Sequence, residues 1–247
     1  MFEPFAQRAV FEVLLLSVGA GVLGPWIVMR GLAFYSHAVA VAAFPGLVLA
    51  AGLGFAPLGG ALGAGALMAL GLSARPTDVV TALALVGALA GGVVLASDVF
   101  HSGSQVDTLL FGSLFAVSGE DLRLAGAASA AAALVTFAFG PRWLAAGFDA
   151  REPRSDAVLI ALVGLIAVAS LAAVGALLAT ALLVVPAASA RLWVSRIGAW
   201  QLATVALAAA EGVGGVWLAV RLNAPPGATI ATLGGVVFAF AVLIKRD

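Results

Sequence analysis

MRGLAFYSHAVAVAAFPG, residues 29–46, is an almost unbroken apolar run that contains a single histidine. A run of this length and composition predicts a helix that crosses a lipid bilayer. This histidine, His37, is one of 2 in the protein. A polar residue at membrane depth usually faces the interior of a helix bundle. The sequence leaves two roles open for the imidazole: it contacts a metal or a transport path, or it is held by hydrogen bonds to Tyr35, Ser36 or a neighbouring helix.

The composition of the whole chain also indicates a membrane protein. Of its 247 residues, 63% are hydrophobic and 10% are charged, and the mean hydropathy is +1.16. A soluble domain carries roughly 25% charged residues, so this chain cannot cover a surface that faces water. We therefore predict an all-α polytopic membrane protein, with about eight or nine transmembrane helices in one bundle. Residues 1–247 would form a single integral-membrane domain.

The expected spans are the apolar runs between short polar clusters, each about 20 residues long or slightly shorter. The third is short and rich in glycine. Its GxxxG step at Gly59 and Gly63, like that at Gly87 and Gly91 in the fourth, predicts close approach of helices in lipid. The expected ranges are 11–29, 33–55, 57–73, 79–97, 122–141, 157–173, 175–191, 198–220 and 228–244.

The basic residues predict which loops face the cytoplasm. The largest polar loop, about 141–156, contains Arg142, Arg151 and Arg154, and short loops rich in arginine and lysine stay on the cytoplasmic side. The same rule places the C-terminus, with Lys245 and Arg246, in the cytoplasm. The loop at about 98–121 would then lie outside. An aromatic belt at the membrane surfaces is expected from the tryptophans near span ends, Trp143, Trp193 and Trp217.

Composition also excludes several classes of function. The formal net charge is +0, so no basic field is available for nucleic acid. There are 0 cysteines, which excludes disulfides and thiolate-ligated metal sites. A Walker A loop needs Gly-Lys followed by Ser or Thr, but the only lysine, Lys245, precedes Arg246. If ATP drives this protein, another polypeptide binds the ATP, and no covalently bound cofactor is expected here.

Five blocks of the sequence, taken in order, resemble one family: the membrane permeases of ATP-driven importers for zinc, manganese and related metals. The order and spacing of the blocks are more specific than any one of them, and the third and fourth are the closest. The blocks are 30–46 (resembling LR…DAxSHAxLPG), 75–78, RPTD (R-x-T-D), 107–122, DTLLFGSLFAVSGEDL (D-x-x-x-x-FGS-x-LAVS-x-x-DL), 174–192, VGALLATALLVVPAASARL (VGxLLVxALLVxPAATARL), and 225–230, PPGATI (PPGPTI).

This resemblance implies an assembly rather than a protein that acts alone. Two permease bundles, as a homodimer or a pair of related chains, would enclose the path for a divalent metal, which is the substrate. A pair of cytosolic ATPase subunits would power transport, and an extracytoplasmic metal-binding protein would deliver the ion. The chain itself would be a non-enzymatic transport subunit in the plasma membrane, surrounded by lipid.

The first block departs from the family pattern at the residues expected to meet the metal. With its two ends aligned, the family's aspartate falls at His37 and its histidine, four residues later, falls at Val41. Residues at i and i+4 share one helix face, so a carboxylate and an imidazole become an imidazole and an isopropyl group. Aligning Ser36-His37-Ala38 with the family's SHA puts Ala33 at the aspartate position instead. Either alignment leaves the pair incomplete, with His37 as the candidate metal contact.

The cytoplasmic loop is the second departure. After Phe-Asp the family usually has a short helix that docks onto the ATPase, whereas only AREPRS separates Asp149 from Asp156 here. Pro153 would also break a helix in so short a segment. The resemblance therefore implies a shortened contact with the ATPase. The candidate docking residues are Asp149, Arg151, Glu152 and Arg154.

Acidic residues within or beside the spans supply further candidates. Glu211 lies within the expected span 198–220, where an unpaired carboxylate is costly. It would be protonated, pair with an arginine of another helix, or line the translocation path. Glu12, near one end of the first span, is expected at the membrane interface. A vestibule that attracts cations, or else an ordinary solvated loop, is predicted around Asp98, His101 and Asp107.

Three functions remain open at this stage. The first is the permease of an ATP-driven importer for zinc or manganese, which moves the ion by alternating access. The second is a secondary transporter that uses Glu211 and His37 as proton-linked groups and needs no ATPase. The third is a degenerate member of the family that serves as a membrane scaffold, which the shortened loop makes conceivable.

Overall fold

The computed structural model describes residues 4–74, 77–100, 114, 117–146 and 157–245. Within these ranges every long element is a helix. Their bounds are α1 Pro4–Arg30, α2 Ala33–Leu53, α3 Pro57–Ala74, α4 Asp78–Val94, the π-helix η1 Leu95–Val99, α6 Gly119–Ala146, α7 Ala157–Val174, α8 Ala176–Arg191, α9 Ile197–Leu222 and α10 Pro226–Lys245.

The helices confirm the predicted membrane spans. Six are long and apolar enough to cross a bilayer, and three shorter apolar helices lie at Pro57–Leu72, Ala157–Ser170 and Ala181–Arg191. Each of the spans expected from the sequence coincides with one of these helices. The protein is therefore an all-α, multi-pass membrane protein. Its backbone polar groups are satisfied within helices, as lipid requires.

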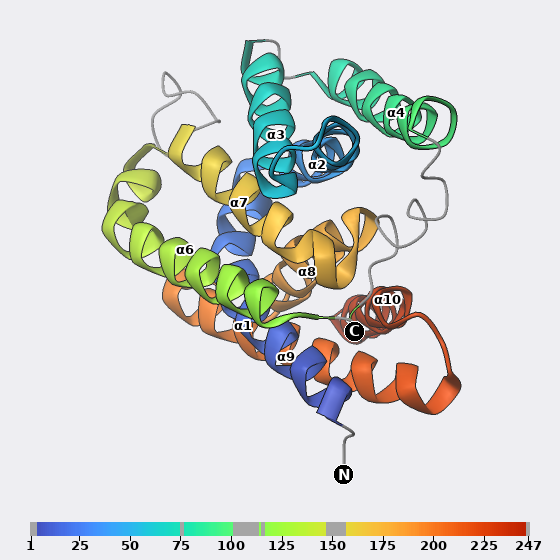
Figure 1. The fold of residues 1–247 in the computed structure, drawn as a ribbon. Helices are drawn as coiled ribbons and strands as arrows, with labels where there is room; N and C mark the ends of the chain where they lie inside the picture. Colours follow the sequence, from blue (N-terminus) through green and yellow to red (C-terminus); the bar gives the residue numbers. More distant parts are fainter. Residues whose placement is uncertain (1–3, 75–76, 101–113, 115–116, 147–156, 246–247) are drawn as a thin grey trace.

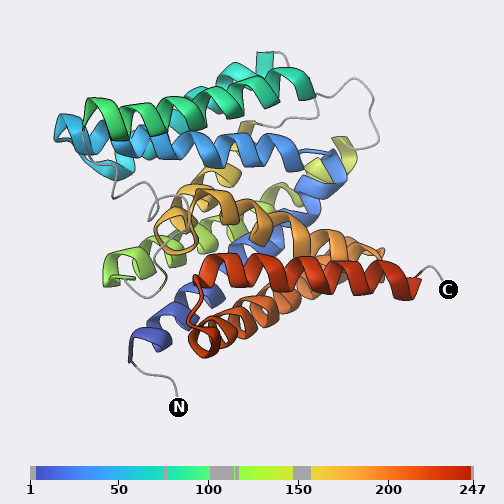
Figure 2. The same ribbon diagram turned by 90° about the vertical axis from the view of Figure 1, so that its right-hand side faces the viewer.

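The helices form two groups with a pair between them (Figure 1). On one side α2 packs against α3 and α4, and on the other α1 packs against α6 and α9, with α10 beside α9. Figure 2 shows the same separation from a view turned by 90°. Helices α7 and α8 lie between the groups and contact both α1 and α2. The main buried core includes Leu16, Leu23, Trp26, Trp143 and Ile166.

The contacts between helices define their relative directions. Helix α6 runs parallel to α1, because Gly126 lies against Leu15 and, near the other end, Arg30 Nη2 donates to the carbonyl of Trp143 at 3.2 Å. Helix α9 runs antiparallel to α1, since Gly212 meets Val13 and Gly21 meets Val205, and α10 runs antiparallel to α9, since Gly215 meets Ile230 while Gly234 meets Glu211. The C-terminal ends of α1, α6 and α10, which carry Arg30, Arg142 and Lys245, therefore lie toward the same end of the bundle.

Two helix starts follow sequence signals directly. Thr77 caps α4, its hydroxyl accepting from the amide of Val80 at 3.3 Å. At α6 Ser118 is the capping residue: its Oγ accepts from the amides of Glu120 and Asp121, both at 3.2 Å. Asp121 Oδ2 in turn accepts from the amide of Ser118 at 2.9 Å. This reciprocal pairing satisfies donors that a helix N-terminus otherwise leaves without partners.

The predicted loop at 141–156 begins too early, and the predicted belt position of Trp143 is wrong. Helix α6 continues through Pro141 to Ala146, although proline removes one helical hydrogen bond. Trp143 is fully buried, and its ring lies 5.3 Å from that of Trp26 at an interplanar angle of 71°. This packing and the bond from Arg30 hold the last turns of α6 in place. The other two tryptophans of the predicted belt, Trp193 and Trp217, are exposed.

The predicted role of the two GxxxG steps is also wrong. A Cβ atom at Gly59, Gly63, Gly87 or Gly91 would meet nothing within 4 Å. The close contact between α2 and α3 uses the neighbouring Gly60, which lies directly against the backbone of Gly46. GxxxG spacing identifies glycines on one helix face, but tertiary packing decides which face meets a neighbour.

Two adjacent glycines of α3 provide a matched test of this contact. We expect Gly60→Ala to lower stability by about 1–3 kcal/mol, because overpacking forces the backbones of α2 and α3 apart. Gly59→Ala, with open space at its Cβ, should be neutral or stabilise the helix by up to about 1 kcal/mol. Thermal unfolding of the purified protein in detergent measures both, and equal midpoints for the two variants would contradict the assigned contact.

Candidate functional site

His37 lies in the second turn of α2, and local hydrogen bonds fix this part of the helix. Tyr35 donates its hydroxyl to the carbonyl of Ala69 on α3 at 2.6 Å, and Ser36 donates to the carbonyl of Ala33 at 2.8 Å. His37 itself is half-buried. The imidazole is therefore held on a helix that is anchored to its neighbour, while part of its surface stays accessible. Such a position suits a residue that contacts a passing ion.

The position one turn after His37 supplies no second ligand. Val41 is fully buried, and α2 contacts α3, α4, α7 and α8. An isopropyl group cannot coordinate a metal. No group of three or more His, Cys, Asp or Glu side chains is close enough to hold a metal ion in the part of the chain that the structure describes. His37 thus offers a single ligand from this chain, rather than a closed metal cage.

Glu211 lies on the buried face of α9, toward α8 and α10. Its side chain is 4% exposed, and its Oε1 atom has no hydrogen-bond partner among the described residues. Its Oε2 atom would be 3.0 Å from a Cβ atom at Gly234 on α10, and Val185 of α8 would be 3.4 Å from the same point. The absence of a side chain at Gly234 is what gives this carboxyl group room.

The structure does not place His37 and Glu211 in one site. Helix α9 packs against α1, α8 and α10, whereas α2 packs mainly with the other group of helices, and α8 contacts both. Figure 2 shows α2 and α9 on opposite sides of the bundle. The two residues are therefore separate candidates, and a mechanism that passes a proton or ion directly between them has no support from this arrangement.

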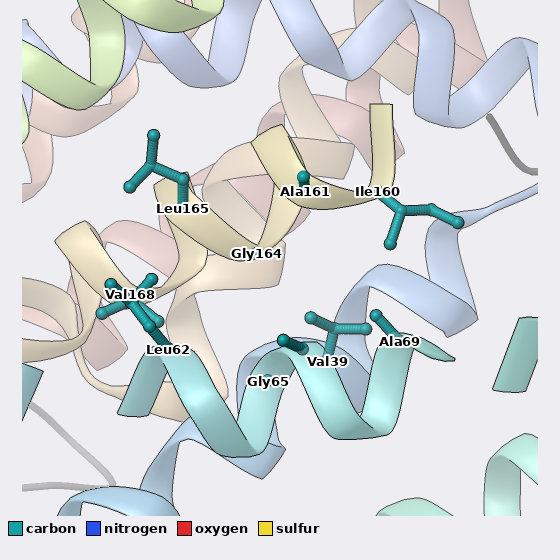
Figure 3. A pocket seen from close by; sticks show the side chains of 10 residues that line it. Val39, Leu62, Gly65, Ala69, Ile160, Ala161, Gly164, Leu165 and Val168 are labelled. Atoms are coloured by element: carbon teal, nitrogen blue, oxygen red, sulfur yellow. The ribbon is translucent and has the colours of Figure 1, made fainter. Parts of the chain in front are cut away.

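An apolar cavity of about 220 Å³ lies between α2, α3 and α7. In Figure 3, Val39 of α2 and Ala69 of α3 lie on one side of it, and Ile160 and Ala161 of α7 on the other. Its lining has no side-chain nitrogen, oxygen or sulfur atom that could bind a metal. The lining residues are Val39, Leu62, Gly65, Ala66, Ala69, Ile160, Ala161, Gly164, Leu165 and Val168.

Several other candidates fall partly or wholly outside the described residues. Asp98 is exposed at the end of the π-helix η1, but His101 and Asp107 lie outside, so the vestibule stays a prediction. The same holds for the docking residues Asp149, Arg151, Glu152 and Arg154.

Glu12 is an acidic residue whose burial the sequence did not predict. Its side chain is 0% exposed within the bundle, while its expected depth near the membrane interface stays a prediction. No local signal could have shown the burial, because α1 is apolar on nearly all sides.

The environment of Glu211 generates a prediction with a matched control in the next residue. We expect Gly234→Ala to destabilise the protein by about 1–3 kcal/mol, because the added methyl group would press on the Glu211 carboxyl and on Val185. Gly235→Ala meets nothing within 4 Å and should not destabilise.

Thermal unfolding of both variants in detergent tests this arrangement. A Glu211→Ala change in the Gly234→Ala background should restore part of the lost stability, because it removes the group that the methyl presses on. No recovery in the double variant would show that the Glu211 carboxyl does not occupy this space.

Comparison with known proteins places the whole chain in one group. The sequence model of a family described as the ABC 3 transport family matches residues 2–245. The manganese transport system membrane protein MntC of Halalkalibacterium halodurans is 27% identical over 251 residues, which cover 96% of this chain and 86% of the relative. The manganese import system permease protein ScaB of Streptococcus gordonii is 27% identical over 254 residues, covering 97% and 91%.

A solved structure has the same fold. PsaBC from Streptococcus pneumoniae in complex with Fab includes a chain that aligns with a TM-score of 0.86 at 25% sequence identity. The alignment covers 97% of this chain and 91% of the other.

Proposed function

The chain belongs to the ABC 3 transport family, and we propose that it is the membrane-spanning permease subunit of an ATP-driven importer for a divalent metal ion. The observation that carries this proposal is the extent of the match: family, relatives and fold all correspond over nearly the whole chain. Manganese is the first metal to test, because both relatives described above are named for manganese transport. Zinc is the alternative that the sequence blocks leave open.

The proposed energy source lies outside this chain. Its sequence has no Gly-Lys pair that could form a Walker A loop, so a pair of cytosolic ATPase subunits would bind and hydrolyse the ATP. A metal-binding protein outside the membrane would deliver the ion, and a second copy of the chain would complete the path. ATP binding in the partners would rock the two bundles between outward- and inward-facing states.

The proposed orientation places the C-terminus in the cytoplasm. In support, Arg30, Arg142 and Lys245 lie toward one end of the bundle because α1, α6 and α10 run in the same direction. Basic residues gather on the cytoplasmic side of membrane proteins. Helix α6 ends at Ala146 at this end of the bundle, and we propose that Asp149, Arg151, Glu152 and Arg154, which follow it in the sequence, face the ATPase pair.

Two residues are proposed as separate candidates for contact with the ion. His37 would contact it directly, because a neutral imidazole is a common ligand for divalent metals. Glu211 would line the path apart from His37, because α8 separates the two helices, and its Oε1 atom has no hydrogen-bond partner among the described residues. Few ligands per chain give weak binding, and weak binding lets an ion leave again, as conduction requires.

The first test is uptake of manganese by cells that express the chain with its ATPase and metal-binding partners. Uptake should disappear when the ATPase is replaced by a variant that cannot hydrolyse ATP. Uptake that persists without ATP hydrolysis and collapses with the proton gradient would instead support a secondary transporter. The buried acid Glu211 gives that alternative a specific starting point.

The second test changes the proposed metal contact. We expect His37→Ala to reduce manganese uptake about tenfold, because it removes one contact to the metal. A loss of about 1.4 kcal/mol in binding free energy corresponds to a tenfold weaker affinity. Phe34→Ala is the matched control, since Phe34 is exposed on the same helix, and its uptake should match the wild type. Unchanged uptake in His37→Ala would remove His37 from the path and leave the permease function standing.

A further inference from the structure

Glu12 is a fully buried acid, and no basic group neutralises it among the residues that the structure describes. Its side chain is 0% exposed in the third turn of α1. Neither carboxylate oxygen has a hydrogen-bond partner among the residues that the structure describes. An ionised carboxylate in such a place loses its hydration without compensation, which costs far more free energy than a protein of ordinary stability can spare.

Glu12 belongs to a line of polar groups between α1 and α6. Seven-residue spacing puts Glu12, Gly19 and Trp26 on one face of α1, and Ser129, Thr136 and Trp143 on one face of α6. We call these six residues the α1–α6 seam. A Cβ atom at Gly19 would be 2.7 Å from Ser129 Oγ, and the rings of Trp26 and Trp143 are 5.3 Å apart. The two faces therefore meet from Gly19 and Ser129 to Trp26 and Trp143, and Glu12 lies two turns before Gly19 on the same face of α1.

The other polar side-chain atoms of the α1–α6 seam are, like the Glu12 carboxyl group, buried without a hydrogen-bond partner among the described residues. The hydroxyls of Ser129 and Thr136 and the indole nitrogens of Trp26 and Trp143 are buried, and none has a hydrogen-bond partner among the described residues. Natural proteins leave few buried polar atoms unsatisfied, and each such atom calls for an explanation. These atoms lie in a file along one helix pair, so any rearrangement that admitted water to the seam would satisfy several of them at once.

The basic residues near α1 and α6 do not neutralise Glu12. Arg8, one turn earlier on α1, is exposed, as is Arg123 on α6, whose Nε donates to the carbonyl of Gly119 at 3.2 Å. Arg30 is 18 residues along α1, about 27 Å at the helical rise of 1.5 Å per residue. The charged residues in the first turn of α6 are Glu120 and Asp121, which are acids and supply no positive charge.

Helix α2, which also contacts α1, has the titratable residues Tyr35 and His37 but begins only at Ala33, beyond the far end of α1 from Glu12. The other helices that pack on α1 also supply no cation at this level. Helix α7 has no titratable residue in its sequence. The only charge of α8 is Arg191, which lies over the ring of Trp200. On α9, Glu211 lies beside Gly234 and Val185, and Arg221 lies over Trp217 at the end of the helix.

We propose that Glu12 is a buried proton-binding site whose occupancy is linked to the opening of the α1–α6 seam. The carboxyl group holds its proton while α1 and α6 are packed together. When the seam opens, water hydrogen-bonds to Ser129 and Thr136 and accepts the proton, leaving a hydrated carboxylate. Because the link is reciprocal, losing the proton favours the open seam and binding it favours the closed one.

This site goes beyond the proposed transport function and does not depend on it. Its ligand is a proton, its residues lie on α1 and α6, and it includes neither His37 nor Glu211. It holds whether ATP or another energy source drives transport.

Infrared spectroscopy of the purified full chain tests the site, because a protonated carboxylic acid has a carbonyl absorption that a carboxylate lacks. Just below neutral pH the exposed acids are ionised. We therefore expect this absorption in the wild type, its loss on titration to alkaline pH, and a clear decrease in Glu12→Gln. The exposed Glu120 is the control, and Glu120→Gln should leave the absorption unchanged.

A Glu12→Gln spectrum identical to that of the wild type would show that Glu12 is ionised and would overturn the proposal. If Glu12→Gln does not fold, Glu211→Gln decides the question. In that variant, Glu12 is the buried acid that remains among the described residues. Remaining absorption of a protonated acid supports the site, and complete loss overturns it. Neither outcome bears on metal uptake, so the test is separate from that of the permease function.

Discussion

Direct contact between helix backbones at glycine is the interaction on which the rest of this bundle depends. In lipid, apolar side chains gain nothing by leaving their surroundings for another helix, so association relies on close packing. Gly46 lies against Gly60 between α2 and α3, Gly24 against the carbonyl of Leu183 between α1 and α8, and Gly215 against Ile230 between α9 and α10. These contacts hold neighbouring helices together and fix how the helices of each pair are aligned along their length.

Such close packing also determines where polar groups can act. Glu211 occupies space that Gly234 leaves open, and Ser129 faces Gly19 across the α1–α6 seam. The cavity between α2, α3 and α7 is apolar, so the candidates for chemistry are single side chains held between helices rather than residues gathered around a pocket. A path built from such residues binds an ion weakly in any one bundle, which suits a subunit that passes its substrate on.

The sequence predicted the helices well because the lipid imposes a simple rule. A chain that crosses a bilayer must satisfy its backbone within helices of about 20 apolar residues, and every expected span matches a helix. The start of α6 also follows from local sequence, because Ser118 and Asp121 have the spacing of a capping box and form one. Of the candidate site, the sequence identified His37 and Glu211 as polar residues inside spans. It could not show that α8 separates their helices.

What the sequence by itself determined is therefore the type and approximate positions of the helices and the family to which they belong, since these follow from local composition and the order of motifs. The tertiary structure alone decided which face of each helix is buried. It brought Gly60 rather than Gly59 against α2, enclosed Trp143 beyond Pro141, and buried the side chain of Glu12. In a chain that is apolar on nearly all sides, hydrophobicity does not distinguish one helix face from another, and only the fit between neighbouring surfaces does.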